Sequence, residues 1–596
     1  MNNCKQIPGG GFLITETSPE HTFIPEDFSE EQRLIAKTTE DFVRGEILPR
    51  IDEIEVQQEG VAEDLMRQAG ELGLLMADIP EAYQGLGLDK ASSALITEKM
   101  GMAGSFSVTH AAHVGISTLP FVFYGTEEQK RKYLPGLGRG DIGSYCLTEP
   151  GSGSDALAAK TTASLSNDGT CYLLNGSKQF ITNARWAKTF VVFAKINGQD
   201  FSAFIVERGM PGVSIGLEEK KLGIKGSSTA SLILENVEVP AANLLGEVGK
   251  GHLIAFNILN IGRYKLGAGC LGAAKLALED AVRYAGERYQ FKKSLNQFGL
   301  IRKKIAQMAT EIFVAESATY RLVGMIDDIL AGNADDHPSA EQVLEGIEEY
   351  AIECSIVKIL ASEMLDFVVD EGLQIHGGYG YCQEYPAERL YRDSRINRIF
   401  EGTNEINRIL IPGMLVRRGL KGQLPLMKKL ADLQEEVKSG RAGQCGDPAE
   451  GFLEVETRMV RNAKKATLMV AGLVIKKHLQ DINEQQELLG LIAEMIIEVF
   501  ALESALLRVG KLMVTMDDSR EDDFALLATR NYLYAAFSRL AAHGEELLAA
   551  VLEGEQLVEM LRVLKRYLDY LPQNTVIMRD KLAAAVIEHK GYPRTY

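Results

Sequence analysis

One carboxylate in an apolar and aromatic stretch is the strongest candidate for catalysis in this chain. Glu401 follows Phe400 and precedes Gly402 and Thr403 in the run RIFEGTNEI. Burial among apolar groups raises the pKa of a carboxyl towards neutrality, which suits a general base. A glycine beside it lets a substrate approach the backbone closely. Taken alone, the segment also fits an exposed Glu at the start of a helix.

Two earlier clusters could hold a flat ligand. The first is YCLTEPGSGSD at 145–155, whose glycines permit close approach of the backbone and whose hydroxyls and amides could bind a ring edge or a pyrophosphate. The second is GSKQFITNA at 176–184, where Phe180 could wall a ring and Thr182 could hydrogen-bond to it. The alternatives are a polar turn that enters a β region and a strand with a core Phe.

Two further patterns are weaker candidates for functional sites. His110 and His113 stand three residues apart, but a metal site needs further ligands, so a helix face beside a pocket is favoured. The run GYGYCQEY lacks the Lys of a triphosphate-binding loop. We therefore expect no metal.

The composition excludes several classes of protein. With 82 acidic and 64 basic residues the formal net charge is -18, which disfavours nucleic-acid binding. The seven cysteines are scattered and form no CxxC pair, which favours a reduced cytosolic protein without structural zinc. No export signal and no run of 18 apolar residues is visible, so we expect a cytoplasmic protein.

The elements that must position these residues follow from the apolar spacing. Spacings of three and four predict helices in 29–143, after an N-terminal extension at 1–28. Short β-rich runs separated by Gly, Asn, Asp and Ser predict a β domain at 144–250. Helical patterns return at 251–419 and continue in an additional domain at 420–596. The predicted fold is mainly α with a central β domain.

The clusters at 145–155, 176–184 and 374–406, in this order, resemble the acyl-CoA dehydrogenase family from about residue 30 to 415. The closest resemblance is to its very-long-chain branch, because of Phe400, Phe180 and the extra C-terminal helical domain. It implies an N-terminal helical domain, a β-barrel-like middle domain and a four-helix bundle. It also implies that Glu401 removes an α proton from a fatty acyl-CoA in β-oxidation, while FAD takes the β hydride to leave a trans-2-enoyl-CoA.

The resemblance also assigns the remaining site residues. Some members carry the base immediately before the Arg that matches Arg263, but Gly262 stands there in this sequence. Substrate contacts are implied for Ser154, Asn260, Arg263 and Gly402. The residues at 288–291 resemble a segment that reaches the FAD of the neighbouring subunit. FAD contacts are implied for Tyr145, Leu147, Thr148, Gly153, Ser154, Phe180, Ile181, Thr182, Arg288, Gln290, Phe291, Gln374, Ile375, His376, Gly377, Gly378, Thr403, Asn404 and Glu405.

Partners are expected from the same resemblance. They are electron-transferring flavoprotein and a second copy of the chain in a homodimer. Two alternatives remain open: an acyl-CoA oxidase that uses oxygen, and a DNA-associated flavoprotein relative. The stretch 458–480 has basic ends around an apolar centre and no acidic residue, so it could lie on the inner face of a membrane. It fits equally a helix that packs its apolar side inward.

Overall fold

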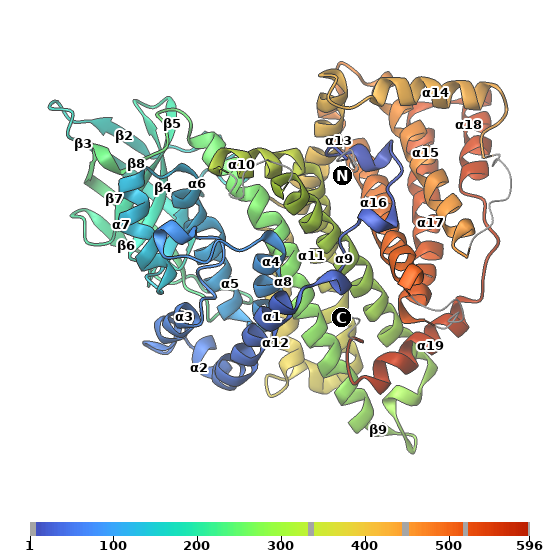
Figure 1. Cartoon of the computed structure of the whole chain (residues 1–596), viewed down its shortest axis with the longest axis horizontal. Helices are drawn as coiled ribbons and strands as arrows, with labels where there is room; N and C mark the ends of the chain where they lie inside the picture. The colour runs from blue at the N-terminus through green and yellow to red at the C-terminus, as the bar shows by residue number, and fades with distance from the viewer. Residues whose placement is uncertain (1–6, 332–338, 444–451, 516–522, 594–596) are drawn as a thin grey trace.

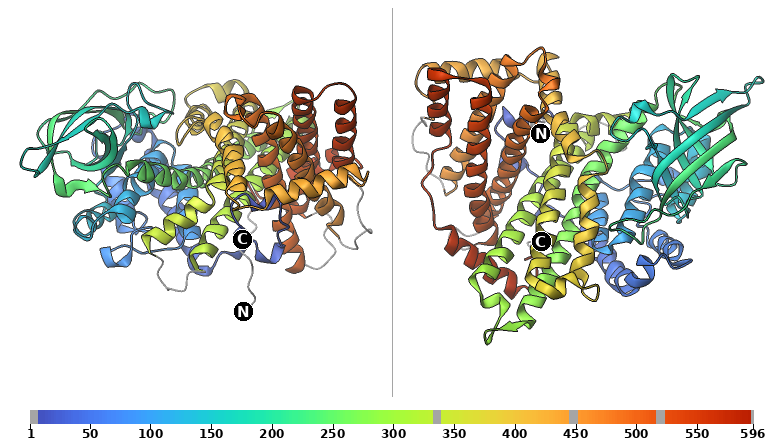
Figure 2. Two further views of the ribbon diagram at one scale, coloured as in Figure 1. Left: turned by 90° about the horizontal axis from the view of Figure 1, so that it is seen from above. Right: turned by 180° about the vertical axis from the view of Figure 1, so that it is seen from behind.

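The chain forms helices, then strands, then two further groups of helices (Figure 1). The computed structural model describes residues 7–331, 339–443, 452–515 and 523–593. The prediction of a mainly helical fold with a central β domain and an extra C-terminal helical domain is confirmed. The long helices of the third group lie between the β domain and the last group (Figures 1 and 2).

The first group consists of short helices. Ser29 begins one of them with a capping box: its Oγ accepts the Gln32 N–H at 3.1 Å, and the Gln32 side chain accepts the Ser29 N–H at 2.9 Å. Between α5 and α6 the chain widens into a π-helical turn, η8 (Ala112–Ser117). The helices are α1 (Glu30–Phe42), α2 (Ile51–Glu55), α3 (Val61–Glu71), α4 (Lys90–Met100), α5 (Ser105–Ala111), α6 (Leu119–Tyr124) and α7 (Glu127–Gly138).

The β domain is one sheet in the order β6-β7-β3-β2-β4-β5-β8, with β1 paired in parallel to β4. Its long strands β3 and β7 are antiparallel, and their register shifts between Lys178 and Ile181. Such a bulge re-aims side chains. The strands are β1 (Gly143–Cys146), β2 (Thr162–Leu165), β3 (Cys171–Thr182), β4 (Thr189–Ile196), β5 (Asp200–Glu207), β6 (Val213–Ile215), β7 (Thr229–Pro240) and β8 (Leu244–Leu245).

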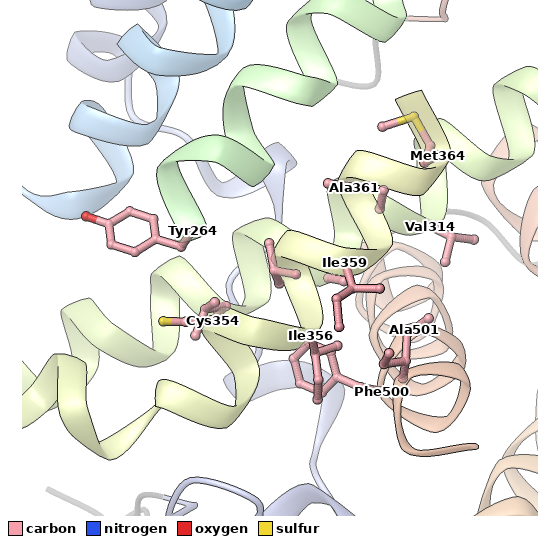
Figure 3. Close-up of a cluster of buried hydrophobic side chains, with 14 of the residues drawn as sticks. Tyr264, Val314, Cys354, Ile356, Ile359, Ala361, Met364, Phe500 and Ala501 are labelled. Carbon is pink, nitrogen blue, oxygen red and sulfur yellow. The ribbon is translucent and has the colours of Figure 1, made fainter. Parts of the chain in front are cut away.

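The third group is built around α11, which is buried over most of its surface. Figure 3 shows Ile356 and Ile359 of α11 beside Phe500 and Ala501 of α16, within one buried cluster. The elements are α8 (Gly251–Glu287), the hairpin β9 (Tyr289–Gln290) and β10 (Lys293–Ser294), α9 (Gly299–Ala331), α10 (Ala340–Glu349), α11 (Ala351–His376), α12 (Pro386–Ser394) and α13 (Asn404–Leu420).

The additional domain packs onto this bundle through α16, α17 and α19. The start of the chain lies in the same place, because Phe12 meets the Phe500 ring edge-on at 4.9 Å and the Gly10 N–H donates to Glu353 Oε1 at 2.7 Å. The described part of the N-terminal extension, from residue 7, therefore contributes to the core. The helices are α14 (Leu426–Lys438), α15 (Glu454–Lys477), α16 (Gln486–Thr515), α17 (Phe524–Val551), α18 (Gly554–Tyr567) and α19 (Thr575–Glu588).

The interfacial interpretation of 458–480 is contradicted by the packing of α15. Its apolar residues, including Met459, Val460 and Val470, are buried in the core. Lys464 is buried in an ion pair with Glu503, and further basic residues of the helix pair with acidic partners. The apolar side of α15 thus packs inward. Among the described helices none is long and apolar enough to cross a bilayer.

Candidate active site

Glu401 lies in the short loop between η13 (Arg395–Arg398) and α13, and its backbone is left-handed. Its φ is 58° and that of Gly402 is 79°. A left-handed conformation is strained for a residue with a side chain and persists only where its surroundings enforce it. Although the residue is partly exposed, its Oε2 atom is shielded from solvent and has no hydrogen-bond partner within the described chain.

Gly262 on α8 makes room for this carboxyl. A Cβ atom at position 262 would lie 2.4 Å from Glu401 Oε2 and 2.7 Å from its Cδ. Real Cβ atoms do not come this close, so any side chain at 262 would displace the carboxyl. The two positions that the family resemblance links to the base therefore face the same point in space.

Two cationic side chains donate hydrogen bonds to backbone carbonyls of the loop that carries Glu401. Arg263 is buried; its Nε donates to the backbone oxygen of Glu401 at 3.3 Å and its Nη1 to Asn260 Oδ1 at 2.7 Å. Lys358 of α11 is also buried, and its Nζ donates to the Gly402 carbonyl at 2.8 Å and to Asn404 Oδ1 at 2.6 Å. These hydrogen bonds hold the backbone of Glu401 and Gly402 in its left-handed conformation.

The loop sets the acidity of Glu401. Burial raises the pKa of its carboxyl to about 7, although the charges of Arg263 and Lys358 act in the opposite direction. Burial likewise lowers the pKa of Lys358 to about 8. A carboxyl with a pKa near neutrality can accept a proton and release it again at physiological pH.

The carboxyl faces a long cavity of about 1080 Å³ that is open to solvent. Along α8 the lining runs from Gly262 to Ala273, which is about 16 Å at 1.5 Å per residue. The lining also includes the small residues Ala111, Ala112 and Gly115. Ser117 does not line the cavity; it is buried, and its Oγ lies next to Gly143 of β1.

The Tyr145–Ser154 segment borders the same region. Tyr145 in β1 is buried, its hydroxyl has no partner within the described residues, and burial raises its pKa well above the ordinary value. Leu147 and Thr148 are partly buried, whereas Gly153 and Ser154 are exposed. A Cβ atom at Gly153 would meet no atom within 4 Å, so a ligand can reach this backbone.

A buried ion pair anchors this loop. Glu149 accepts the Lys178 ammonium at 2.6 Å and the N–H groups of Lys160 and Thr161 at 2.6 and 3.0 Å. The side chains of the pair are buried, whereas Gly151 and Gly153 of the loop are exposed. The role of the pair is to fix the backbone that carries the exposed glycines.

The bulge in β3 divides the second cluster into two faces. Phe180 has a φ of 57° and its side chain is 61% exposed. Thr182 lines the cavity beside Glu401. The Ile181 side chain, in contrast, packs in the core of the β domain, so only its backbone could face a ligand.

A second cleft, of about 750 Å³, lies at the far end of α8. Its lining includes Arg288 and Gln290 on one side and Ile375, His376, Gly377 and Gly378 on the other. Gln374 and Phe291 are exposed near it, and Phe291 is at the tip of the β9–β10 turn. His376 is held by the Gly372 carbonyl at 2.8 Å and by Asp280 at 3.2 Å, so its imidazole is already engaged.

The start of α13 has mostly structural contacts. Thr403 is its N-cap and accepts the Ile406 N–H at 3.2 Å. Asn404 is buried against Lys358 and donates to Ser362 at 3.1 Å, while Glu405 is exposed. Of these three predicted FAD contacts, Asn404 points inward, towards Lys358 and Ser362.

The histidines of the THAAH run are buried, and each bonds to a backbone carbonyl. His110 Nε2 pairs with the Leu74 carbonyl at 3.2 Å, and His113 Nε2 pairs with the Leu137 carbonyl at 3.0 Å. Burial lowers the pKa of His110 to about 3 and that of His113 to about 4. Both rings are therefore neutral core groups.

Comparison with known proteins decides the family. Four family models match in chain order: the acyl-CoA dehydrogenase N-terminal domain at 29–141, its middle domain at 144–237, a C-terminal domain at 249–414 and a further C-terminal domain at 462–566. The chain is 51% identical to a "Probable acyl-CoA dehydrogenase" of Bacillus subtilis over 586 residues, which is 98% of both proteins. The chain belongs to the acyl-CoA dehydrogenase family.

Further relatives extend this comparison. The very long-chain specific acyl-CoA dehydrogenase of Rattus norvegicus is 36% identical over 76% of this chain and 70% of its own length. A crystal structure of an acyl-CoA dehydrogenase complexed with FAD from Bacillus anthracis has a TM-score of 0.96 and 49% identity, and covers 99% of this chain and 100% of that one. The resemblance drawn from the three clusters is thus confirmed.

Membership of this family gives the Gly262 contact a testable consequence. Gly262→Ala should lower kcat about 100-fold while the fold is retained, because the new methyl displaces a flexible carboxyl rather than backbone. Turnover and thermal unfolding would be measured together. Gly413→Ala in α13 is the matched control, since a Cβ atom there meets nothing within 4 Å. Normal turnover of Gly262→Ala would remove Glu401 from the reacting position.

Proposed function

We propose that this protein is an FAD-dependent acyl-CoA dehydrogenase that oxidises the α and β carbons of long-chain fatty acyl-CoA, with Glu401 as the base. One observation carries the proposal: the unpartnered Glu401 carboxyl, with a pKa near 7, lies on the wall of a long cavity directly against Gly262. A base with no competing internal partner is free to take a proton from a substrate.

The residues around Glu401 fit a flavin. Phe180 offers an exposed ring, Tyr145 a shielded and unpartnered hydroxyl, and Gly153 an open stretch of backbone. A flat, partly apolar ring with a polar edge matches this set. The close relative from Bacillus anthracis was crystallised with FAD. When bound, FAD supplies the acceptor for the β hydride.

The chain's own residues account for the proton transfer. The thioester carbonyl must be polarised before an α proton becomes acidic enough to remove. Within the described chain the Glu401 N–H donates no hydrogen bond, so it can donate to that carbonyl while the Glu401 carboxylate takes the proton. Arg263 and Lys358 hold the carbonyls of Glu401 and Gly402, and so fix the direction of the amide.

These contacts indicate a positioning role for Arg263 and its partner Asn260. The guanidinium points inward to the loop. Binding of the CoA moiety by Arg263, which the resemblance implied, remains a prediction. The exposed Ser154 keeps its proposed place near the thioester end of the substrate.

Electrons are proposed to pass to electron-transferring flavoprotein. The alternative is an oxidase that passes them to oxygen. The two separate in one experiment: enzyme reduced anaerobically with palmitoyl-CoA is mixed with aerated buffer or with electron-transferring flavoprotein. Slow reoxidation in air and rapid reoxidation by the flavoprotein support the proposal, and the reverse order contradicts it.

We expect kcat/KM to rise from butyryl-CoA to palmitoyl-CoA. The cavity extends about 16 Å along α8, and each buried methylene contributes about 0.8 kcal/mol of binding. The measurement is steady-state kinetics over a series of even chain lengths. Ala273→Phe, at the far end of the lining, should remove the gain for palmitoyl-CoA and leave butyryl-CoA unaffected. A kcat/KM that peaks at butyryl-CoA would contradict long-chain specificity.

We expect a homodimer. From Gly262 to Glu287 the axis of α8 is about 38 Å long, which exceeds the length of an extended FAD. One FAD therefore cannot contact both the Glu401 region and the Arg288 cleft of the same chain, and a second copy must supply one of them. The additional domain covers a face of the bundle where a further dimer could dock. Light scattering should give twice the mass of the chain; a stable tetramer contradicts this.

Complementation between two inactive variants tests whether each FAD site is built from two subunits. Glu401→Gln and Arg288→Ala subunits are each expected to be inactive alone. When co-expressed, a mixed dimer has both defects in one site and none in the other, so activity returns. Absence of any recovery, in mixed dimers isolated by two affinity tags, would show that each chain binds FAD alone.

A further inference from the structure

A polar cavity of about 840 Å³ lies between the bundle and the additional domain, away from Glu401. Its walls are α9, α17 and α19, which lie side by side in Figure 1, together with the segment that joins α18 to α19. The part of it that a water molecule can enter is about 340 Å³, which is in the range of small-molecule sites. The lining residues are Gln307, Thr310, Glu311, Asn531, Tyr532, Tyr534, Ala535, Arg539, Tyr570, Pro572, Gln573, Thr575 and Arg579.

Most of the charge in this cavity is already neutralised. Arg539 forms a bidentate ion pair with Glu498, and its guanidinium lies 5.1 Å from the centre of the Tyr532 ring. The Tyr532 hydroxyl donates to the same Glu498 at 3.0 Å. The polar groups of Arg539, Glu498 and Tyr532 are thus paired with one another, and these side chains are held in place.

Two side chains of opposite charge, Glu311 and Arg579, have no partner of the opposite charge among the described residues. Glu311 on α9 has no hydrogen bond and no ion pair with any residue that the structure describes. Arg579 on α19 has no carboxylate partner in the same part of the chain; its Nη1 reaches only Asn531 Oδ1, at 3.4 Å. Asn531 in turn donates to Thr310 at 3.1 Å, so the guanidinium is oriented from the cavity wall.

Leaving a partly buried charge without a partner is costly, and each such group needs an explanation. The two groups do not pair with each other, although they line one cavity. Hydroxyls and amides between them, from Tyr570, Gln573 and Thr575, supply donors and acceptors but little apolar surface. A ligand that satisfies all of this is polar and carries both charges.

We propose that this cavity binds a small zwitterion of the amino-acid type, with its ammonium group at Glu311 and its carboxylate at Arg579. The site shares no lining residue with the cavity beside Glu401. The additional domain supplies two of its walls, α17 and α19, and the bundle supplies α9.

The acidity of Glu311 gives the binding a pH dependence. Burial raises the pKa of Glu311 to about 7, with Arg539 opposing the shift and Glu498 adding to it. The groups that face Glu311 are therefore these two, with Tyr532 beside them and Arg579 across the cavity. An ammonium group needs the ionised carboxylate. Affinity should fall about tenfold per pH unit below about 7 and level off above it.

The probes are glycine, γ-aminobutyrate and 6-aminohexanoate, which differ only in the spacing between their charges. Each is titrated into the full-length flavoprotein by calorimetry, with butylamine and butyrate as single-charge controls. At least one zwitterion should bind, and Glu311→Gln and Arg579→Gln should each weaken it ten- to a hundred-fold. Lys303→Gln and Glu588→Gln, on exposed parts of α9 and α19, are matched controls that should bind normally.

Retained flavin and acyl-CoA turnover show that each variant is folded. Binding that weakens in both cavity variants and not in the controls supports the proposal. The proposal fails if no zwitterion binds at millimolar concentration. It also fails if the cavity variants bind as the wild type does, or if butyrate alone binds as tightly as the best zwitterion.

Discussion

Glu401→Gln should lower turnover by about 10²- to 10⁴-fold or more, the scale of a lost general base, while FAD stays bound. The substitution is nearly isosteric, and the bonds that hold the loop reach the carbonyls of Glu401 and Gly402 rather than the carboxyl. The amide would therefore keep its place beside Gly262. Turnover with palmitoyl-CoA and the flavin spectrum of the purified variant would be compared with the wild type.

The pH profile supplies a second check on the same residue. Because the pKa of Glu401 is about 7, kcat/KM of the wild type should rise about tenfold per pH unit below about 7 and then level off. The small residual rate of Glu401→Gln should lack this limb. Near-normal turnover of the variant, or an unchanged profile, would rule out Glu401 as the base.

Arg508→Met should destabilise the protein by about 3–5 kcal/mol. Arg508 of α16 is fully buried; it donates to Glu316 of α9 at 2.6 Å and to Glu26 of the N-terminal extension at 2.7 Å. Removal of the guanidinium leaves these carboxylates in a buried place, with Lys275 as the remaining cation beside Glu316. The measurement is the free energy of unfolding in urea, followed by circular dichroism.

A surface pair provides the control. Arg461 pairs with Glu16 at 2.7 Å, but their side chains are 43% and 72% exposed. Exposed pairs contribute about 0–1 kcal/mol, so Arg461→Met should be nearly neutral. Equal effects of the two substitutions would mean that Arg508 is no more important than a surface charge.

The ion pairs of Glu316 with Lys275 and Arg508 also make the stability of the protein depend on pH. Burial alone would raise the pKa of Glu316, but Lys275 and Arg508 together lower it to about 2. A depressed pKa in the folded state contributes stability that is complete above the ordinary pKa of Glu, near 4.5, and is lost as pH falls towards 2. In Arg508→Met this loss should begin at a higher pH.

Local sequence patterns were sufficient for the types of the elements, and with the family resemblance they proposed Glu401 as the base. Glu401, Gly262 and Thr182 line one cavity, although they come from a loop, from the middle of α8 and from the end of β3. Lys358 was missed. The available signal was a single lysine inside the apolar run SIVKILASEM, where a charge needs a buried partner.

Contacts between distant parts of the chain could not be predicted in this way. The inward direction of Arg263 depends on Glu401, and the anchoring of Glu149 depends on Lys178 in the next strand but one. The basic ends of α15 suggested a membrane surface because their acidic partners, such as Glu503 and Glu436, belong to other helices. A pattern read along one helix cannot show what covers it.

The N-terminal extension has a consequence for the order of synthesis. Glu26 is made early, but its partner Arg508 follows 482 residues later. At about 5–20 residues per second, the ribosome needs roughly 25 to 95 seconds to add the intervening chain. During that interval the extension can already dock on α11 through Gly10 and Glu353, but its link to α16 cannot yet form. The contact between Glu26 and Arg508 is therefore among the last to be made.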